Sequence, residues 1–193
     1  IASILISVGV PSFRGVVLDS RMVSEANQFV SSIGLARSSA VRFQRAAIIC
    51  TSDDFSVAVP TCSGSTDWSN GWIVWVDKDR DNATDADEIM SVQEPFSDTT
   101  TFTSTTANRF IYDARGFGLA AADTLTLCDN RTAETGRAVS VNAVGRTNVS
   151  QTNCTWDDVP ADASIDTLIA GLGRLVLVIV GLYVMVSIVS GLQ

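Results

Sequence analysis

The chain contains no histidine and only one lysine, Lys78, in 193 residues. Histidine is the usual general acid or base near neutral pH, and it commonly activates serine and cysteine nucleophiles. A zinc site is also disfavoured, because neither histidine nor a Cys-x-x-Cys pair is present to supply the ligands. We therefore expect a protein that is not an enzyme and that has no small-molecule substrate.

The cysteines form an even set of four, Cys50, Cys62, Cys128 and Cys154, which favours disulfides. Four cysteines allow three pairings, and we favour Cys50 with Cys62 and Cys128 with Cys154, because each bond closes a short segment between predicted strands. Disulfides indicate an oxidising compartment such as a periplasm or the cell exterior. The alternative of four reduced thiols in a cytosolic core remains open, since cysteines are often simply buried.

Half of the net charge of −8 lies between residues 77 and 88, where six acidic residues face two basic ones. Carboxylates occupy positions 1, 3, 5, 9 and 12 of the twelve-residue calcium-loop pattern: Asp77, Asp79, Asp81, Asp85 and Glu88. Asn82 replaces the glycine of position 6, and asparagine also adopts left-handed backbone conformations. The preceding residues read as a strand, unlike the helix of an EF-hand. We expect either a Ca²⁺ site or a solvated acidic hairpin loop.

The N-terminal part predicts one long helix. An apolar run, Ile1–Val10, leads into Pro11, and apolar residues then recur every three or four positions as far as Phe43. This spacing places the following residues on one helical face: Met22, Ala26, Phe29, Val30, Ile33, Ala36 and Ala40. We expect Pro11 to kink or interrupt the helix. At about 1.5 Å per residue, a helix of some 43 residues would span roughly 60 Å, so part of this stem, residues 1–45, must project from the head.

After the helix, the apolar residues alternate with a period of two, which predicts a β head over residues 46–154. The expected strands are Ala46–Cys50, Phe55–Pro60, Gly71–Asp77, Arg109–Asp113, Thr124–Cys128 and Ala138–Val144. Helical crossovers do not fit between them, so the strands should be antiparallel and pack on the helix. Gly116, Gly118, Gly136 and Gly145 mark expected turns. The segment Thr99–Thr106 reads equally as an edge strand or an exposed loop.

The last part of the chain becomes apolar again. Residues 155–164 form an acidic linker, and residues 165–193 read as a hydrophobic helix of a membrane or a filament core. Arg174 lies near one end of this run, where its side chain could reach the headgroups. The fold class that we expect is therefore α+β, a long N-terminal helix packed on an antiparallel head, plus a C-terminal hydrophobic helix.

This order of parts resembles the type IV pilin superfamily, and within it the minor pilins and type II secretion pseudopilins of the GspH/FimT kind. The resemblance covers residues 1–154. It is carried by Pro11 with its apolar lead-in, by RFIYDARGFG (Arg109–Gly118), by TLTLC (Thr124–Cys128), and by GRAVSVNAVGR (Gly136–Arg146) followed by Cys154. The aromatic residue and glutamate with which mature chains of this family begin lie upstream of the apolar run and are not present here. The family does not explain the hydrophobic tail.

The resemblance implies a structural subunit of a type IV pilus or of a pseudopilus-like filament. Such a subunit would assemble with other pilin subunits and membrane lipid through its helix, here through Ile1–Val10, Pro11 and the stretch from Phe13 to Phe29. Its head would be displayed for adhesion, secretion or uptake. The implied location is the bacterial inner membrane with a periplasmic or extracellular head, or a cell-surface filament.

Two alternatives remain. The chain would be an accessory subunit of a larger membrane complex if the tail anchors it and the head serves as a docking module. A DNA-uptake minor pilin would use Arg131, Arg137 and Arg146, but the family's Gly-Arg-x-Arg motif lacks its second arginine at Gly145–Asn148. The net charge of −8 also argues against DNA, because phosphate binding requires several clustered cations.

Overall fold

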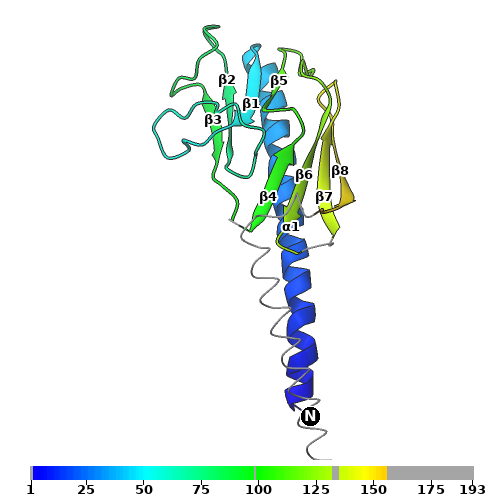
Figure 1. Ribbon diagram of the computed structural model, residues 1–193. Coiled ribbons are helices and arrows are strands. Elements are labelled where there is room, and N and C mark those ends of the chain that lie inside the picture. Colours follow the sequence, from blue (N-terminus) through cyan, green and yellow to red (C-terminus); the bar gives the residue numbers. More distant parts are fainter. Residues whose placement is uncertain (1, 98, 132–134, 156–193) are drawn as a thin grey trace, which may run out of the picture.

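The computed structural model describes residues 2–97, 99–131 and 135–155, with the side chains of residues 2–14 and of residue 135 left out. One helix, α1 (Ala2–Phe43), is followed by eight strands (Figure 1). The helix runs through Pro11 without a break, so of the two effects predicted for this proline, a kink or an interruption, the interruption is wrong. Proline removes only one helical hydrogen bond, and the turns on both sides carry the helix across it. The acidic linker from residue 156 on and the predicted C-terminal helix lie outside the described residues.

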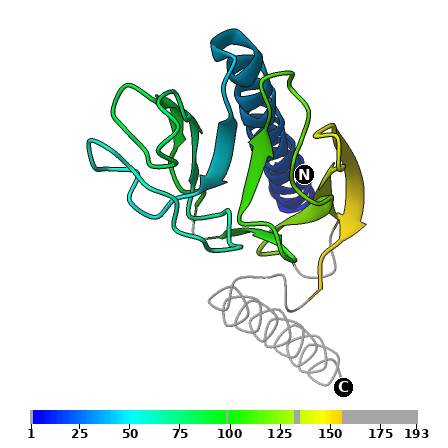
Figure 2. The ribbon, with the colours of Figure 1, turned by 90° about the horizontal axis from the view of Figure 1, so that it is seen from above.

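The strands form two four-stranded antiparallel sheets, where the sequence had indicated one head without further division. The first sheet has the order β3-β2-β1-β5, and the second has the order β4-β6-β7-β8. The strands of the first sheet are β1 (Ala47–Thr51), β2 (Trp72–Val76), β3 (Ile89–Gln93) and β5 (Arg109–Tyr112). Those of the second are β4 (Thr100–Ser104), β6 (Asp123–Asp129), β7 (Thr135–Val141) and β8 (Thr147–Asn153). Seen from above, the strands curve around one side of α1 (Figure 2).

Most predicted strands are present within a few residues of the expected bounds, but Phe55–Pro60 is a loop. Asp54 prevents a strand there, because its carboxylate accepts hydrogen bonds from the Ser52 hydroxyl and from the Thr61 backbone and folds the chain back. The segment Thr99–Thr106, which the sequence left open between an edge strand and an exposed loop, contains strand β4. Strands β3 and β8 were missed, since their sequences IMSVQ and TNVSQTN are short or polar.

The core lies between the helix and both sheets. The buried stripe of α1 is the one that the spacing predicted, and it begins at Met22. Phe29 is at its centre and makes edge-to-face contacts with Trp68, Trp72, Phe102 and Phe110, at ring-centroid distances of 5.1–6.2 Å. Aromatic pairs at this separation stabilise a core beyond their area of burial. The helix and the two sheets are therefore joined through one aromatic cluster.

Both predicted disulfides are confirmed. Cys50–Cys62 closes the loop that follows β1, and Cys128–Cys154 ties β6 to the residue after β8. Gly136 lies within β7 beside the second bond, so its assignment to a turn is wrong. A Cβ atom at this position would come within 2.5 Å of the Cys154 sulfur, which explains why a strand residue here is glycine.

Candidate functional site

The lower half of α1 projects beyond the head (Figure 1). Within residues 15–43, the buried side chains begin at Met22, whereas Val16 is 60% exposed and Val17 is 50% exposed. Val23 is also exposed, and it lies two helical turns from Val16 on the same face. Exposure of apolar side chains to water is unfavourable, so exposed valines on a projecting helix form a candidate contact surface. We call Val16, Val17 and Val23 the stem surface.

Of the residues that we expected in the assembly surface, Phe29 needs a correction. It is completely buried in the aromatic core of its own head, because it faces the sheets about two turns beyond Met22, where the buried stripe begins. Pro11 and Phe13 lie in the projecting part of α1, but their side chains are outside the described residues. No helix in the described part of the chain is long and apolar enough to span a membrane.

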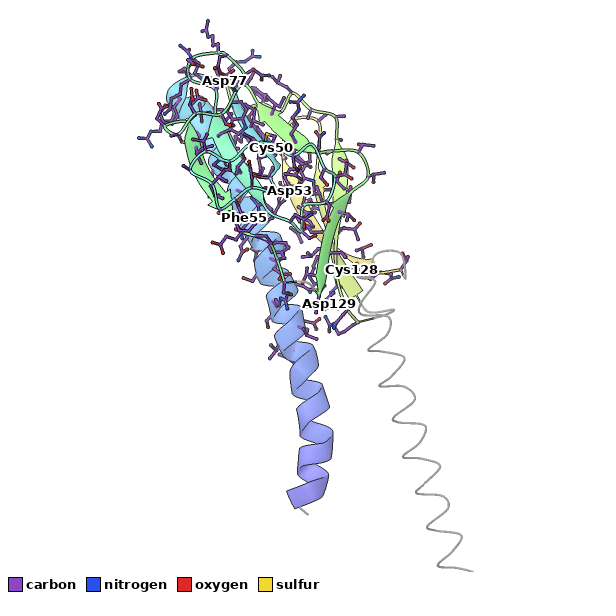
Figure 3. The ribbon with its side chains drawn as sticks, turned by 60° about the vertical axis from the view of Figure 1, so that its left-hand side comes forward. Cys50, Asp53, Phe55, Asp77, Cys128 and Asp129 are labelled. Carbon is purple, nitrogen blue, oxygen red and sulfur yellow. A yellow bond between two sulfur atoms is a disulfide. The ribbon has the colours of Figure 1, made fainter. Side chains whose placement is uncertain are left out.

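A second candidate is the acidic loop, residues 77–88, which connects β2 to β3. The carboxylate oxygens of Asp77, Asp79 and Asp81 lie within 4.8 Å of one another. Asp77 is at the end of the head that points away from the stem (Figure 3). Asp85 is exposed and outside this group of three, and Glu88 is also outside it but is buried. The structure thus brings three of the five predicted ligands together.

The backbone of the loop turns as the sequence suggested. Asn82 has φ 59°, in the left-handed region, and Arg80 has φ 73°. The Asp77 carboxylate accepts hydrogen bonds from the backbone of Arg80 at 2.8 Å, Asp79 accepts from Asp81 at 3.1 Å, and Asp81 accepts from Ala83 at 2.8 Å. Each aspartate therefore uses one oxygen to shape the loop.

The three arginines of the DNA hypothesis do not form one patch. Arg131 precedes β7 and forms ion pairs with Asp129 at 2.7 Å and Asp19 at 2.9 Å. Arg146 lies in the turn after β7 and lines an open cleft of about 550 Å³ together with Asp123 and Asn148. Arg137 lies within β7 itself. Seven strand residues span about 23 Å, so Arg131 and Arg146 are at opposite ends of the sheet, and Arg131 is already neutralised.

A charged network at the stem end of the head was not predicted. It consists of Asp19, Arg21 and Glu25 on α1, with Asp129 and Arg131 from the end of β6, near the labelled Asp129 in Figure 3. Arg21 bonds Glu25 at 2.8 Å and also donates to the Thr100 hydroxyl at 2.7 Å. The spacing of Arg21 and Glu25, four residues apart on a helix, was the available signal. The burial of Glu25 depends on the sheet and could not be predicted from the helix alone.

Comparisons with known proteins identify one matching family and two similar structures. A family model described as "Type II transport protein GspH" matches residues 25–145. Two crystal structures of the type IV minor pilin FimU from Pseudomonas aeruginosa have similar folds. One has a TM-score of 0.53 and 21% identity, covering 68% of this chain and 90% of that chain. The other has a TM-score of 0.50 and 22% identity, covering 66% and 90%. No curated protein has a significantly matching sequence. At these identities, the likeness to FimU concerns the fold.

Proposed function

Since the chain belongs to the GspH family of type II transport proteins, we propose that it is a minor pilin or pseudopilin, a structural subunit of a type IV pilus or of a type II secretion pseudopilus. The family predicted from residues 1–154 is thereby confirmed. In this proposal the subunit joins other pilin subunits through the helix that projects from the head, and the β head is displayed on the filament in the cell envelope.

The observation that carries the proposal is the stem surface. The head buries α1 only from Met22 onward and on one face, which leaves Val16 and Val17 below it, and Val23 on the outer face, in water. Burial of apolar area stabilises by about 25 cal/mol per Å², so packing of stems against one another removes this cost in the filament. The two disulfides agree with a head that is outside the cytoplasm, where such bonds persist. Attachment to the inner membrane before assembly is part of the proposal.

The test is to place a charge on the stem surface. Val16→Asp should reduce incorporation into sheared filaments at least tenfold, because an aspartate cannot be buried between helices without a partner. The matched control is Val57→Asp, which makes the same change at an exposed valine in the loop after β1. Incorporation would be measured by immunoblotting of filament and cell fractions. Incorporation of Val16→Asp at the level of Val57→Asp would refute assembly through this surface.

The other two functions are not proposed. The accessory-subunit alternative depends on residues 165–193, which lie outside the described part of the chain. DNA uptake would need adjacent arginines that are free to bind phosphate, and Arg131 is engaged by two carboxylates.

A further inference from the structure

The acidic loop concentrates negative charge that no nearby cation offsets. Among the described residues, no ion pair involves Asp77, Asp79 or Asp81. The ammonium of Lys78 instead pairs with Asp87 at 3.1 Å and lies over the Phe43 ring. Arg45 reaches the loop, but its guanidinium donates to the Lys78 carbonyl at 3.1 Å and not to a carboxylate. The three carboxylates, whose oxygens lie within 4.8 Å of one another, thus accept hydrogen bonds from the loop backbone but have no cation as a partner among the described residues.

Glu88 provides a second, independent observation. Its side chain is only 2% exposed, and its Oε2 atom is buried without a hydrogen-bond partner in the described part of the chain. The other oxygen, Oε1, accepts from the backbone N–H of Lys78, the residue between Asp77 and Asp79. Oε1 therefore faces the first turn of the loop, although Glu88 lies outside the group of three aspartates. A buried carboxylate oxygen without any partner is costly unless a cation completes its coordination.

We propose that the acidic loop binds one Ca²⁺ ion, with Asp77, Asp79 and Asp81 as carboxylate ligands and Glu88 closing the site through Oε2. Calcium takes six to eight oxygen ligands in a flexible geometry, whereas Mg²⁺ requires near-ideal octahedral geometry and retains several waters. The loop offers several carboxylates together with backbone carbonyls, which suits the larger ion. Asp85 occupies the position that in calcium loops often acts through a bridging water.

Binding would tie the start of the loop to its end. Glu88 is the residue immediately before β3, and its backbone carbonyl accepts from Val76 at the end of β2. An ion shared by Glu88 and the aspartates would therefore fasten the twelve residues between the two strands into one conformation. The ordered loop would be presented at the end of the head that is farthest from the stem (Figure 3).

The experiment uses the full chain, purified in chelator and titrated with CaCl₂ by calorimetry. We expect one site with a dissociation constant of about 0.1–1 mM, the range of extracellular calcium modules. At 10 mM CaCl₂ the melting temperature should rise by roughly 3–10 °C over its value in chelator. The same concentration of MgCl₂ should give less than half of that shift.

Three variants locate the site. Glu88→Gln and Asp79→Asn should each weaken calcium binding at least tenfold, and Asp79 is exposed, so its replacement leaves the fold intact. The matched control is Asp87→Asn, which removes one negative charge from the same loop outside the group of three and should change the affinity less than threefold. A common weakening by all three variants would show attraction to general charge and not a built site.

The proposal is overturned if 10 mM CaCl₂ produces neither heat nor a change in melting temperature. It is also overturned if Glu88→Gln and Asp79→Asn bind with wild-type affinity, or if magnesium binds as tightly as calcium. None of these results depends on filament assembly, because the loop is in the head and the stem surface is not involved.

Discussion

Glu25 and Glu88 are two buried carboxylates at opposite ends of the head. In both, one oxygen makes a hydrogen bond, and Oε2 is buried without a partner within the described residues. The difference is the donor. Glu25 is bonded by the guanidinium of Arg21, a full positive charge, whereas Glu88 is bonded by a neutral backbone N–H. The fold therefore supplies its own counter-charge at the stem end and leaves one to be supplied at the other end.

The pKa of Glu25 reflects both its burial and its counter-charge. Burial raises its pKa, the Arg21 hydrogen bond and charge oppose that rise, and Asp129 adds to it. A raised carboxylate pKa means that ionisation is less favourable in the folded state, so the contribution of Glu25 to stability falls as the pH rises from its unfolded pKa through its folded pKa. Arg21 limits this loss at neutral pH.

The largest effect should come from removing the counter-charge at the stem end. Arg21→Met should lower the free energy of unfolding by about 3 kcal/mol at pH 7, because it leaves a buried carboxylate unpaired. The loss should be smaller at pH 4, where Glu25 takes up a proton. Urea unfolding at both pH values measures this.

The control for this prediction is the double variant Arg21→Met with Glu25→Gln, which should recover most of the lost stability because no buried charge remains. Arg42→Met, at an exposed arginine of the same helix, should cost less than about 0.5 kcal/mol. If the double variant is no more stable than Arg21→Met alone, the cost arises from lost packing and not from the charge.

The second largest effect on stability concerns Glu88, where a substitution should stabilise the fold and not destabilise it. In chelator, Glu88→Gln should raise the free energy of unfolding by about 1–2 kcal/mol, because it removes a buried charge whose nearest donor is neutral. Glutamine keeps an oxygen that can accept from Lys78. Thermal and urea unfolding without calcium would measure the change. A loss of stability in chelator would mean that the folded protein already compensates Glu88, and the contrast with Glu25 would disappear.

The parts of the molecule that could be predicted are those set by local pattern. The apolar stripe Met22–Ala40 has helical spacing, and strands such as Trp72–Val76 consist of β-branched and aromatic residues, so both were predictable. The cysteine pairing followed from short segments between strands. Asp77, Asp79 and Asp81 occupy every second position at the start of one loop. This local spacing was enough to predict that their carboxylates lie close together.

The parts that could not be predicted depend on contacts distant in sequence. Strand β8 is mostly polar and exposed, and only its pairing with β7 defines it. Phe29 has the pattern of a stem residue, and its burial results from four aromatic rings that come from three other parts of the chain. For the same reason, the burial of Glu25 and the free oxygen of Glu88 became visible only once the sheets were in place.

The smallest effect on stability concerns Asp123. Its carboxylate is partly exposed and has several hydrogen-bond donors. Burial opposes its ionisation, but hydrogen bonds from Ser104, Thr124, Ala107 and Thr106 outweigh this and lower the pKa of Asp123 to about 2. A lowered carboxylate pKa stabilises the fold above the ordinary pKa near 3.9, and this contribution is lost as the pH falls from about 4 to about 2. Because Asp123 is partly exposed and solvent screens its interactions, we expect it to contribute only about 1 kcal/mol.

Asp123→Asn should therefore lower stability by about 1 kcal/mol at pH 7 and remove that part of the acid dependence between pH 4 and pH 2. Asp53→Asn, at an exposed aspartate in the loop after β1, should leave the curve unchanged and serves as the control. Chemical unfolding as a function of pH gives both curves. If Asp123→Asn retains the wild-type acid dependence, the hydrogen bonds to Asp123 do not stabilise the fold, and the loss of stability in acid arises from other carboxylates.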